Sequence, residues 1–153
     1  MDNKRGRIPT TVGELMTEKV ETINLLNTAQ EAAIKMANRN VSSLAVVDDD
    51  CKAFGIVTER DLARRICTTN KSCDNVTIQE IMSCPIIAIK PVESLETAAR
   101  YMVQNRVRHL LVINEMNQPI GIITATDFTA YLKENDEIDK VIRQVLREHA
   151  RYE

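Results

Sequence analysis

Apolar residues occur along this chain in short clusters separated by polar stretches, and the spacing within each cluster indicates the element it forms. The runs Leu44–Val47 and Leu110–Ile113 are continuously apolar and end in polar turn residues, which is typical of strands buried on both faces. Residues 29–39 carry apolar side chains at helical spacing, and Thr28 with Glu31 provides a capping box at the start of that helix. The pattern therefore predicts buried strands alternating with amphipathic helices.

The same reading of the whole chain predicts an α+β fold of two β-α-β-β-α units, each preceded by one helical turn. In the first unit we expect the turn at 12–16, strands at 20–23, 44–47 and 54–57, and helices at 28–39 and 59–66. In the second unit we expect the turn at 78–82, strands at 86–89, 110–113 and 120–123, and helices at 94–104 and 125–133.

The two predicted units repeat one sequence, because residues 12–62 align without a gap on residues 78–128. The most distinctive identical pairs are Met16 with Met82, Met36 with Met102, Leu44 with Leu110, Gly55 with Gly121, Thr58 with Thr124, and Asp61 with Asp127. A unit of about sixty residues is marginal for independent stability. We therefore expect the repeats to share one core, with pseudo-twofold symmetry and equivalent clefts between them.

A further segment follows the repeats and has no counterpart in either. Asn135 suits the N-cap of a helix, and apolar residues follow it at helical spacing: Ile138, Val141, Ile142, Val145 and Leu146. We expect this stripe to pack on the rest of the chain and to contribute to a dimer contact. The predicted domains are an N-terminal arm at 1–11, repeats at 12–68 and 77–134, a linker at 69–76, and a C-terminal helix at 135–153.

Composition and charge narrow the function classes. A formal net charge of −2 and a pI near 5.8 argue against a dedicated nucleic-acid or membrane-surface binder. No apolar run approaches the roughly 20 residues that span a bilayer, and the N-terminus does not read as a signal peptide. We therefore expect a cytoplasmic protein with reduced cysteines. The spacing of those cysteines matches no common zinc pattern, so no metal site is predicted.

The polar residues shared by the repeats stand where a strand gives way to a helix. Thr58 with Asp61, and Thr124 with Asp127, match a helix N-cap followed by an acidic third residue, which is a common structural device. The same place also suits a ligand, since free N–H groups and the positive end of the helix dipole favour a phosphate. Thr could contact that phosphate, Asp could accept from ribose hydroxyls, and the preceding Gly would allow close approach.

Here the span from Val12 to Lys133 resembles a tandem pair of cystathionine β-synthase (CBS) domains, the Bateman module. The resemblance rests on Gly-Ile-x-Thr-x-x-Asp after a buried strand, which occurs twice. Further matches are Leu44–Asp48, Arg108–Val112, and the pairs Met16-Thr17 and Met82-Ser83. The resemblance implies two units packed through their sheets, with ligand clefts between them that take AMP, ADP, ATP, S-adenosylmethionine or NAD. It also implies a regulatory protein without catalytic residues that forms a disc-like homodimer through its helices.

The resemblance assigns residues of both repeats to each cleft. For the first cleft it implies Thr58, Arg60, Asp61, Ile86, Ile87, Ala88, Arg108 and His109. For the second it implies Thr124, Thr126, Asp127, Val20, Glu21, Thr22, Ser42 and Ser43. Under this assignment, Asp61 and Asp127 bind the ribose, and Thr58 and Thr124 contact the phosphate. The backbone at 86–88 contacts the edge of the adenine.

The two clefts are expected to differ, since Arg108 and His109 align with Ser42 and Ser43. Charged donors bind phosphate more strongly than neutral ones, so the Asp61 cleft is predicted to be the stronger phosphate site. The mixed-charge helix that carries Glu59-Arg60-Asp61 and Arg64-Arg65 is interpreted by itself as a solvated face.

Three alternatives stay open. The first is a protein-interaction module with degenerate ligand sites. The second is a nucleic-acid binder that uses Lys4, Arg5, Arg7, Arg143, Arg147 and Arg151, which the overall acidity disfavours. The third is an enzyme of the IMP dehydrogenase kind, which carries the same pair of domains. Its catalytic barrel needs about 250 residues, and this length is not present. The ligand and the downstream protein partner are not specified by the sequence.

Overall fold

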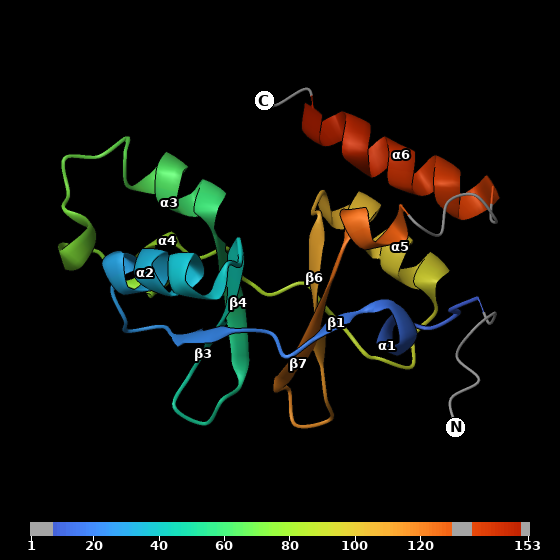
Figure 1. Cartoon of the computed structure of the whole chain (residues 1–153), viewed down its shortest axis with the longest axis horizontal. Coiled ribbons are helices and arrows are strands. Elements are labelled where there is room, and N and C mark those ends of the chain that lie inside the picture. The colour runs from blue at the N-terminus through green and yellow to red at the C-terminus, as the bar shows by residue number, and fades with distance from the viewer. Residues whose placement is uncertain (1–7, 130–135, 151–153) are drawn as a thin grey trace. The chain divides into compact units, whose positions relative to one another are not determined.

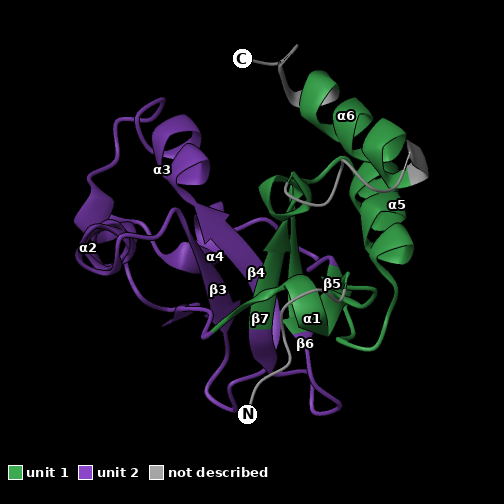
Figure 2. Cartoon of the chain, turned by 45° about the vertical axis from the view of Figure 1, so that its right-hand side comes forward, with its two compact units in different colours: residues 1–18, 88–112, 121–153 green, residues 19–87, 113–120 purple. Residues whose placement is uncertain are grey.

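The computed structural model describes residues 8–129 and 136–150, which form two compact units. Unit 1 contains residues 1–18, 88–112 and 121–153, and unit 2 contains residues 19–87 and 113–120 (Figure 2). Each unit therefore combines segments of both sequence repeats. The α+β class, with a sheet and helices for each repeat and an additional C-terminal helix, is confirmed.

The sheet of unit 2 has three strands in the order β2-β3-β4, of which β3 and β4 are labelled in Figure 1. Its strands are β2 (Thr22–Asn24), β3 (Ser43–Val47) and β4 (Ala53–Thr58), with β2 parallel and β4 antiparallel to β3. Its helical elements are α2 (Ala29–Arg39), α3 (Glu59–Arg65), η1 (Cys73–Asn75) and α4 (Ile78–Ile81). The capping box predicted for α2 is present, since Glu31 N donates to Thr28 Oγ1 at 3.2 Å and Thr28 N donates to Glu31 Oε2 at 2.7 Å.

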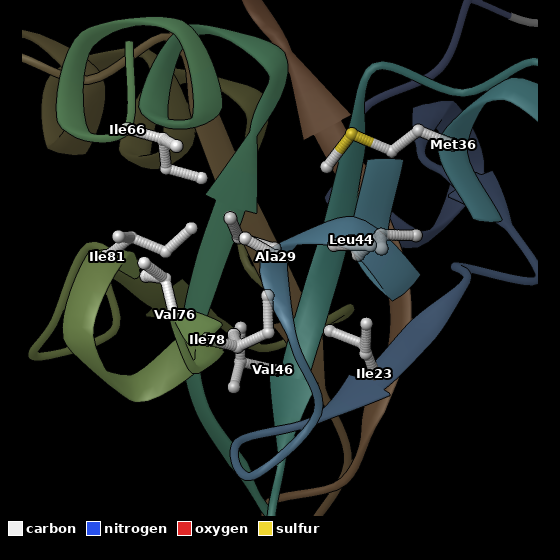
Figure 3. Close-up of a cluster of buried hydrophobic side chains, with 11 residues drawn as sticks. Ile23, Ala29, Met36, Leu44, Val46, Ile66, Val76, Ile78 and Ile81 are labelled. Carbon is white, nitrogen blue, oxygen red and sulfur yellow. The ribbon is translucent and has the colours of Figure 1, made fainter. Parts of the chain in front are cut away.

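The core of unit 2 joins residues from both repeats (Figure 3). Leu44, Val46 and Val57 supply it from the sheet, while Ile78 and Ile81 supply it from α4. Backbone hydrogen bonds fix α4 in place, because Ala29 N donates to Val76 O at 2.8 Å and Ile78 N donates to Asn27 O at 2.9 Å. The first helical turn of the second repeat thus completes the core around the first repeat's helix.

Unit 1 has the reciprocal arrangement. Its sheet has the order β1-β7-β6-β5, and β1 is antiparallel to β7 while β5 is parallel to β6. Its elements are α1 (Val12–Leu15), β1 (Thr17–Glu18), β5 (Ala88–Ile89), α5 (Leu95–Asn105), β6 (His109–Ile113), β7 (Pro119–Thr124) and η2 (Ala125–Phe128). Val12 N donates to Glu93 O and Gly13 N donates to Pro91 O, both at 2.9 Å. The first helical turn of the chain therefore packs on the second repeat.

The C-terminal helix α6 (Asp136–Ala150) packs against α5 and η2 within unit 1 (Figure 2). Three residues of its predicted stripe, Ile138, Ile142 and Val145, are buried. The expected packing of this helix on its own chain is therefore observed. The proposed N-cap, Asn135, lies outside the described residues.

Several element boundaries differ from expectation. The strand expected at 20–23 is β2 at Thr22–Asn24, and the strand expected at 86–89 shrinks to β5 at Ala88–Ile89. A strand is defined by its ladder partners, and β5 pairs only at these two residues, with Leu111 and Val112. The helix expected at 125–133 is described as the short η2, and residues 130–135 lie outside the described part. Apolar patterning did not predict β1 or η1.

Candidate functional site

The Thr58–Asp61 pair forms a capping box where β4 gives way to α3. Asp61 N donates to Thr58 Oγ1 at 3.2 Å, while Thr58 N and Thr58 Oγ1 donate to Asp61 Oδ2 at 2.9 and 3.0 Å. The Asp61 residue is 9% exposed, and its Oδ1 faces Arg65 Nε at 3.8 Å. The hydroxyl and one carboxylate oxygen are thus used by the fold, which leaves Oδ1 as the better candidate acceptor for a ligand.

The second pair occupies the equivalent place, where β7 gives way to η2. Thr124 and Asp127 form a capping box at the start of η2, and Thr124 N donates to Asp127 Oδ2 at 2.7 Å. The structural interpretation considered from the sequence is therefore correct for both pairs. It does not exclude ligand binding, because a cap also fixes the orientation of the carboxylate before any ligand arrives.

The glycines of the repeated motif are explained by the protein's own backbone. A Cβ on Gly55 would lie 2.6 Å from Ser83 O, because Ile56 and Ser83 exchange hydrogen bonds of 2.9 and 3.2 Å. A Cβ on Gly121 would lie 2.6 Å from Met16 Sδ and 3.0 Å from Thr17 O. The close approach predicted for a ligand is made instead by the segment that follows α4 or α1.

The predicted site residues divide between the units. Unit 2 contains Thr58, Arg60, Asp61, Ile86, Ile87, Val20, Glu21, Thr22, Ser42 and Ser43. Unit 1 contains Ala88, Arg108, His109, Thr124, Thr126 and Asp127. Each predicted set draws on both units, so the full assignment of residues to two clefts stays a prediction.

Within each unit the structure brings some of these residues together. Glu59 N donates to Ser42 O at 3.0 Å, and Ser43 pairs with Thr58 across the ladder of β3 and β4. In unit 1 the equivalent bond runs from Ala125 N to Arg108 O at 2.9 Å. The two serines therefore adjoin the cap of their own repeat, and Arg108 adjoins the cap of the second repeat.

The segment at 20–22 lies in a charged part of unit 2. Glu21 pairs with Lys35 at 3.7 Å and with Arg39 at 3.9 Å, and Lys35 Nζ also donates to Thr22 O at 2.5 Å. Thr22 borders a hollow of about 470 Å³, which is lined by Thr22, Ile23, Asn24, Asn27, Glu31, Lys35, Val47, Asp48, Asp49 and Cys51. Thr22 is the only predicted site residue that lines this hollow.

Sequence analysis missed a contact made by Arg65. Its Nη1 donates to Ile81 O at 2.7 Å and to Met82 O at 2.8 Å, and its Nε lies near Asp61. The interpretation of Arg65 as part of a solvated face is therefore incomplete. Its spacing of four residues from Asp61 on one helix was the available signal.

The described residues contain neither a cluster of metal-ligand side chains nor a helix that could span a membrane. Among residues 8–129 and 136–150, no group of three or more His, Cys, Asp or Glu could hold a metal ion. No helix within those ranges has the length and apolar character needed to cross a bilayer.

Comparison with known proteins identifies the repeats. The family model described as "CBS domain" matches residues 12–68 and again residues 78–134. This chain belongs to the CBS-domain family. The resemblance inferred from the repeated motif is therefore confirmed, and the two matches make the chain a CBS pair.

Curated relatives support the same conclusion. CBS domain-containing protein YhcV of Bacillus subtilis is 31% identical over 135 residues, which is 88% of this chain and 94% of that protein. The uncharacterized protein MK0525 of Methanopyrus kandleri is 33% identical over 116 residues, 76% of this chain. The aligned region spans 59% of the length of MK0525, and other relatives are longer still.

Solved structures share the fold. The CBS domain protein TA0289 of Thermoplasma acidophilum matches with a TM-score of 0.79 and 27% identity, over 92% of this chain and 76% of that one. The CBS domain pair of protein MJ0100, solved with 5′-methylthioadenosine and S-adenosyl-L-methionine, matches with a TM-score of 0.71 and 26% identity. That match covers 80% of this chain and 98% of the MJ0100 pair.

Proposed function

We propose that this CBS pair is a regulatory module that binds an adenosine-containing ligand. The observation that carries the proposal is the Thr-x-x-Asp motif, which recurs as a capping box after a buried strand in both repeats. Support from relatives comes from the MJ0100 pair, which was solved with two adenosyl compounds. AMP, ADP and ATP are the ligands we favour, with S-adenosylmethionine and NAD as alternatives.

Each motif residue has a role in this proposal. Asp61 Oδ1 accepts from a ribose hydroxyl, because Oδ2 is already held by Thr58. The backbone at 86–88 contacts the adenine edge. Arg108 and His109 serve the phosphate, since charge-assisted bonds to phosphate are stronger than neutral ones. Asp127 and Thr124 make the corresponding contacts in a second, weaker site.

The ligand would act by shifting an equilibrium. A bound nucleotide changes the protein only if it prefers one arrangement over another, and a downstream protein reads the difference. We propose a cytoplasmic homodimer in this role, with no reaction catalysed by the pair itself. Relatives named as enzymes agree with this division, because the homoserine O-acetyltransferase of Methanohalobium evestigatum aligns over 24% of its length.

The direct test is ligand-dependent stabilisation. A ligand that binds only the folded state raises the melting temperature with its concentration, so we expect AMP, ATP or S-adenosylmethionine to do so. Asp61→Asn should weaken binding at least tenfold by calorimetry, because it removes the charged acceptor while leaving an oxygen for the cap. Asp61→Ala is a poorer test because it also removes half of the capping box.

Two controls accompany this test. Asp50→Asn makes the same change in an exposed turn of unit 2 and should leave binding unaltered. Asp127→Asn reports on the second site. Wild-type binding that survives in Asp61→Asn would refute the role of Asp61, and the absence of any ligand-dependent shift would refute the sensor itself.

A protein-interaction module is the second candidate. The observation that favours it is that both Thr-Asp pairs are fully explained as helix caps. This candidate predicts that a partner protein binds equally well with and without nucleotide. A partner protein whose affinity changes with nucleotide would support the nucleotide sensor over the interaction module.

A further inference from the structure

Arg65 connects Asp61, a proposed ligand residue, to the end of α4 within unit 2. It lies in the last turn of α3, four residues after Asp61. Its Nη1 donates to Ile81 O at 2.7 Å and to Met82 O at 2.8 Å, while its Nε lies 3.8 Å from Asp61 Oδ1. One guanidinium therefore faces the motif carboxylate and the end of α4 together.

The two carbonyls that Arg65 binds are at the C-terminus of a helix. α4 ends at Ile81 with Met82 as its C-cap, and the last carbonyls of a helix have no partner within it. A cation at this end also complements the negative end of the helix dipole. Arg65 thus satisfies carbonyls that would otherwise depend on water.

The segment after α4 leads directly to the predicted adenine contact. Ser83 bridges to Ile56 of β4, and Ile86 and Ile87 follow three and four residues later. Its distance from β4 is set by Gly55, as described above. Arg65 and this bridge together hold the segment against the strand and helix that present Thr58 and Asp61.

This arginine belongs to one repeat. The position equivalent to Arg65 in the second repeat is occupied by Tyr131, whose side chain cannot donate two charge-assisted bonds. Tyr131 lies outside the described residues, so this contrast between the repeats is one of sequence. This difference adds to the one made by Arg108 and His109.

We propose that Arg65 is a positioning residue for the ligand site of the first repeat, acting through Asp61 and through the segment 82–87. The inference rests on the proposed function. Arg65 orients Asp61 Oδ1 and anchors the segment that contacts the ligand base, so a ligand that touches both is bound to a preassembled surface. By thermodynamic reciprocity, ligand binding at Asp61 stabilises the attachment of α4 to α3.

The experiment compares the wild-type chain with Arg65→Met and Arg65→Lys, using AMP, ATP and S-adenosylmethionine as probes. Calorimetry gives the Kd, and hydrogen exchange of the peptide covering 78–87 is followed with and without each probe. Arg65→Met should raise the Kd by roughly five- to tenfold and abolish the ligand-induced slowing of exchange at 82–87. The Kd of Arg65→Lys should lie between those of the wild type and Arg65→Met, since lysine offers one nitrogen where arginine uses two.

Arg64→Met is the matched control, because it removes an arginine from the adjacent, exposed position of the same helix. It should leave the Kd and the exchange response as in the wild type. A lower melting temperature in Arg65→Met with an unchanged Kd would show a purely structural role and overturn the inference. A wild-type chain that binds none of the probes would instead refute the proposed function, and the inference with it.

Discussion

Gly55 and Gly121 occupy the same position in the two repeats. The atoms that an added Cβ would meet differ in how easily they can move aside. The nearest atom to a Cβ on Gly55 is a backbone oxygen, Ser83 O at 2.6 Å. The nearest atom to a Cβ on Gly121 is Met16 Sδ, also at 2.6 Å. A thioether on a flexible side chain can move, whereas a hydrogen-bonded backbone cannot move without losing its bonds.

We therefore expect Gly55→Ala to destabilise the protein more than Gly121→Ala. The first should cost about 1–3 kcal/mol, as overpacking in a well-packed region does, and the second should cost less because Met16 can repack. Urea unfolding of both variants measures the difference. Equal losses would show that the Ile56–Ser83 bridge moves as easily as a methionine side chain.

At the scale of elements, the capping boxes that begin α2 and α4 lower the pKa of their glutamates, Glu31 and Glu80. The backbone N–H of Thr28 lowers the pKa of Glu31 below its usual 4.5, with the Asn27 side chain as a further donor. The backbone N–H of Thr77 does the same for the pKa of Glu80, and bonds from the Thr77 hydroxyl and Lys71 add to it. Hydrogen bonds to the charged form favour that form.

Since folding lowers both pKa values, these glutamates stabilise the protein fully above pH 4.5 and lose that contribution as the pH falls through their folded values. The variant Glu31→Gln/Glu80→Gln keeps the capping boxes without the charge. It should be less stable than wild type near neutral pH, and the difference should shrink as the pH falls below 4.5. Urea midpoints measured across this range give the result.

Glu96→Gln provides the control, because Glu96 lies in the first turn of α5 outside any capping box. A stability difference between wild type and the double variant that stays constant with pH would contradict the assignment. The sign of the effect follows from the lowered pKa values and does not depend on their size.

At the scale of the whole molecule, the repeats exchange their first helical turns. α1 of the first repeat is bonded to Pro91 and Glu93, and α4 of the second repeat is bonded to Asn27 and Leu25. Val12, Ile78 and Ile81 are buried as a result. A cut in the linker therefore leaves each half without a helix that its own core needs.

We expect fragments 1–70 and 71–153 to be unfolded separately and to fold when mixed, as judged by far-UV circular dichroism and two-dimensional NMR. The intact chain cleaved at an inserted protease site between the same residues is the control, and it should stay folded. A fragment that folds cooperatively without its partner would show that the exchanged helices are dispensable.

Much of the local structure was readable from the sequence because its causes lie within a few residues. Apolar periodicity gave α2 and α5, continuous apolar runs gave β3 and β6, and capping residues marked where helices begin. The repeat itself led to the CBS family, since two copies of one motif at a constant offset constrain each other. The Thr-Asp pairs were found for the same reason, both as caps and as candidate ligand contacts.

Other features were decided only when distant segments came together. The extent of β2 and β5 follows from their ladder partners. Gly55 is required because Ser83 O approaches it closely. Arg65 donates to carbonyls that lie 16 and 17 residues further along the chain. Nothing local to α1 or α4 specifies which repeat each completes. The sequence determined which elements form, because helix and strand preferences are short-ranged. Tertiary structure determined which of them share a core and what the repeated Thr-x-x-Asp polar groups contact, because those are properties of the packed chain.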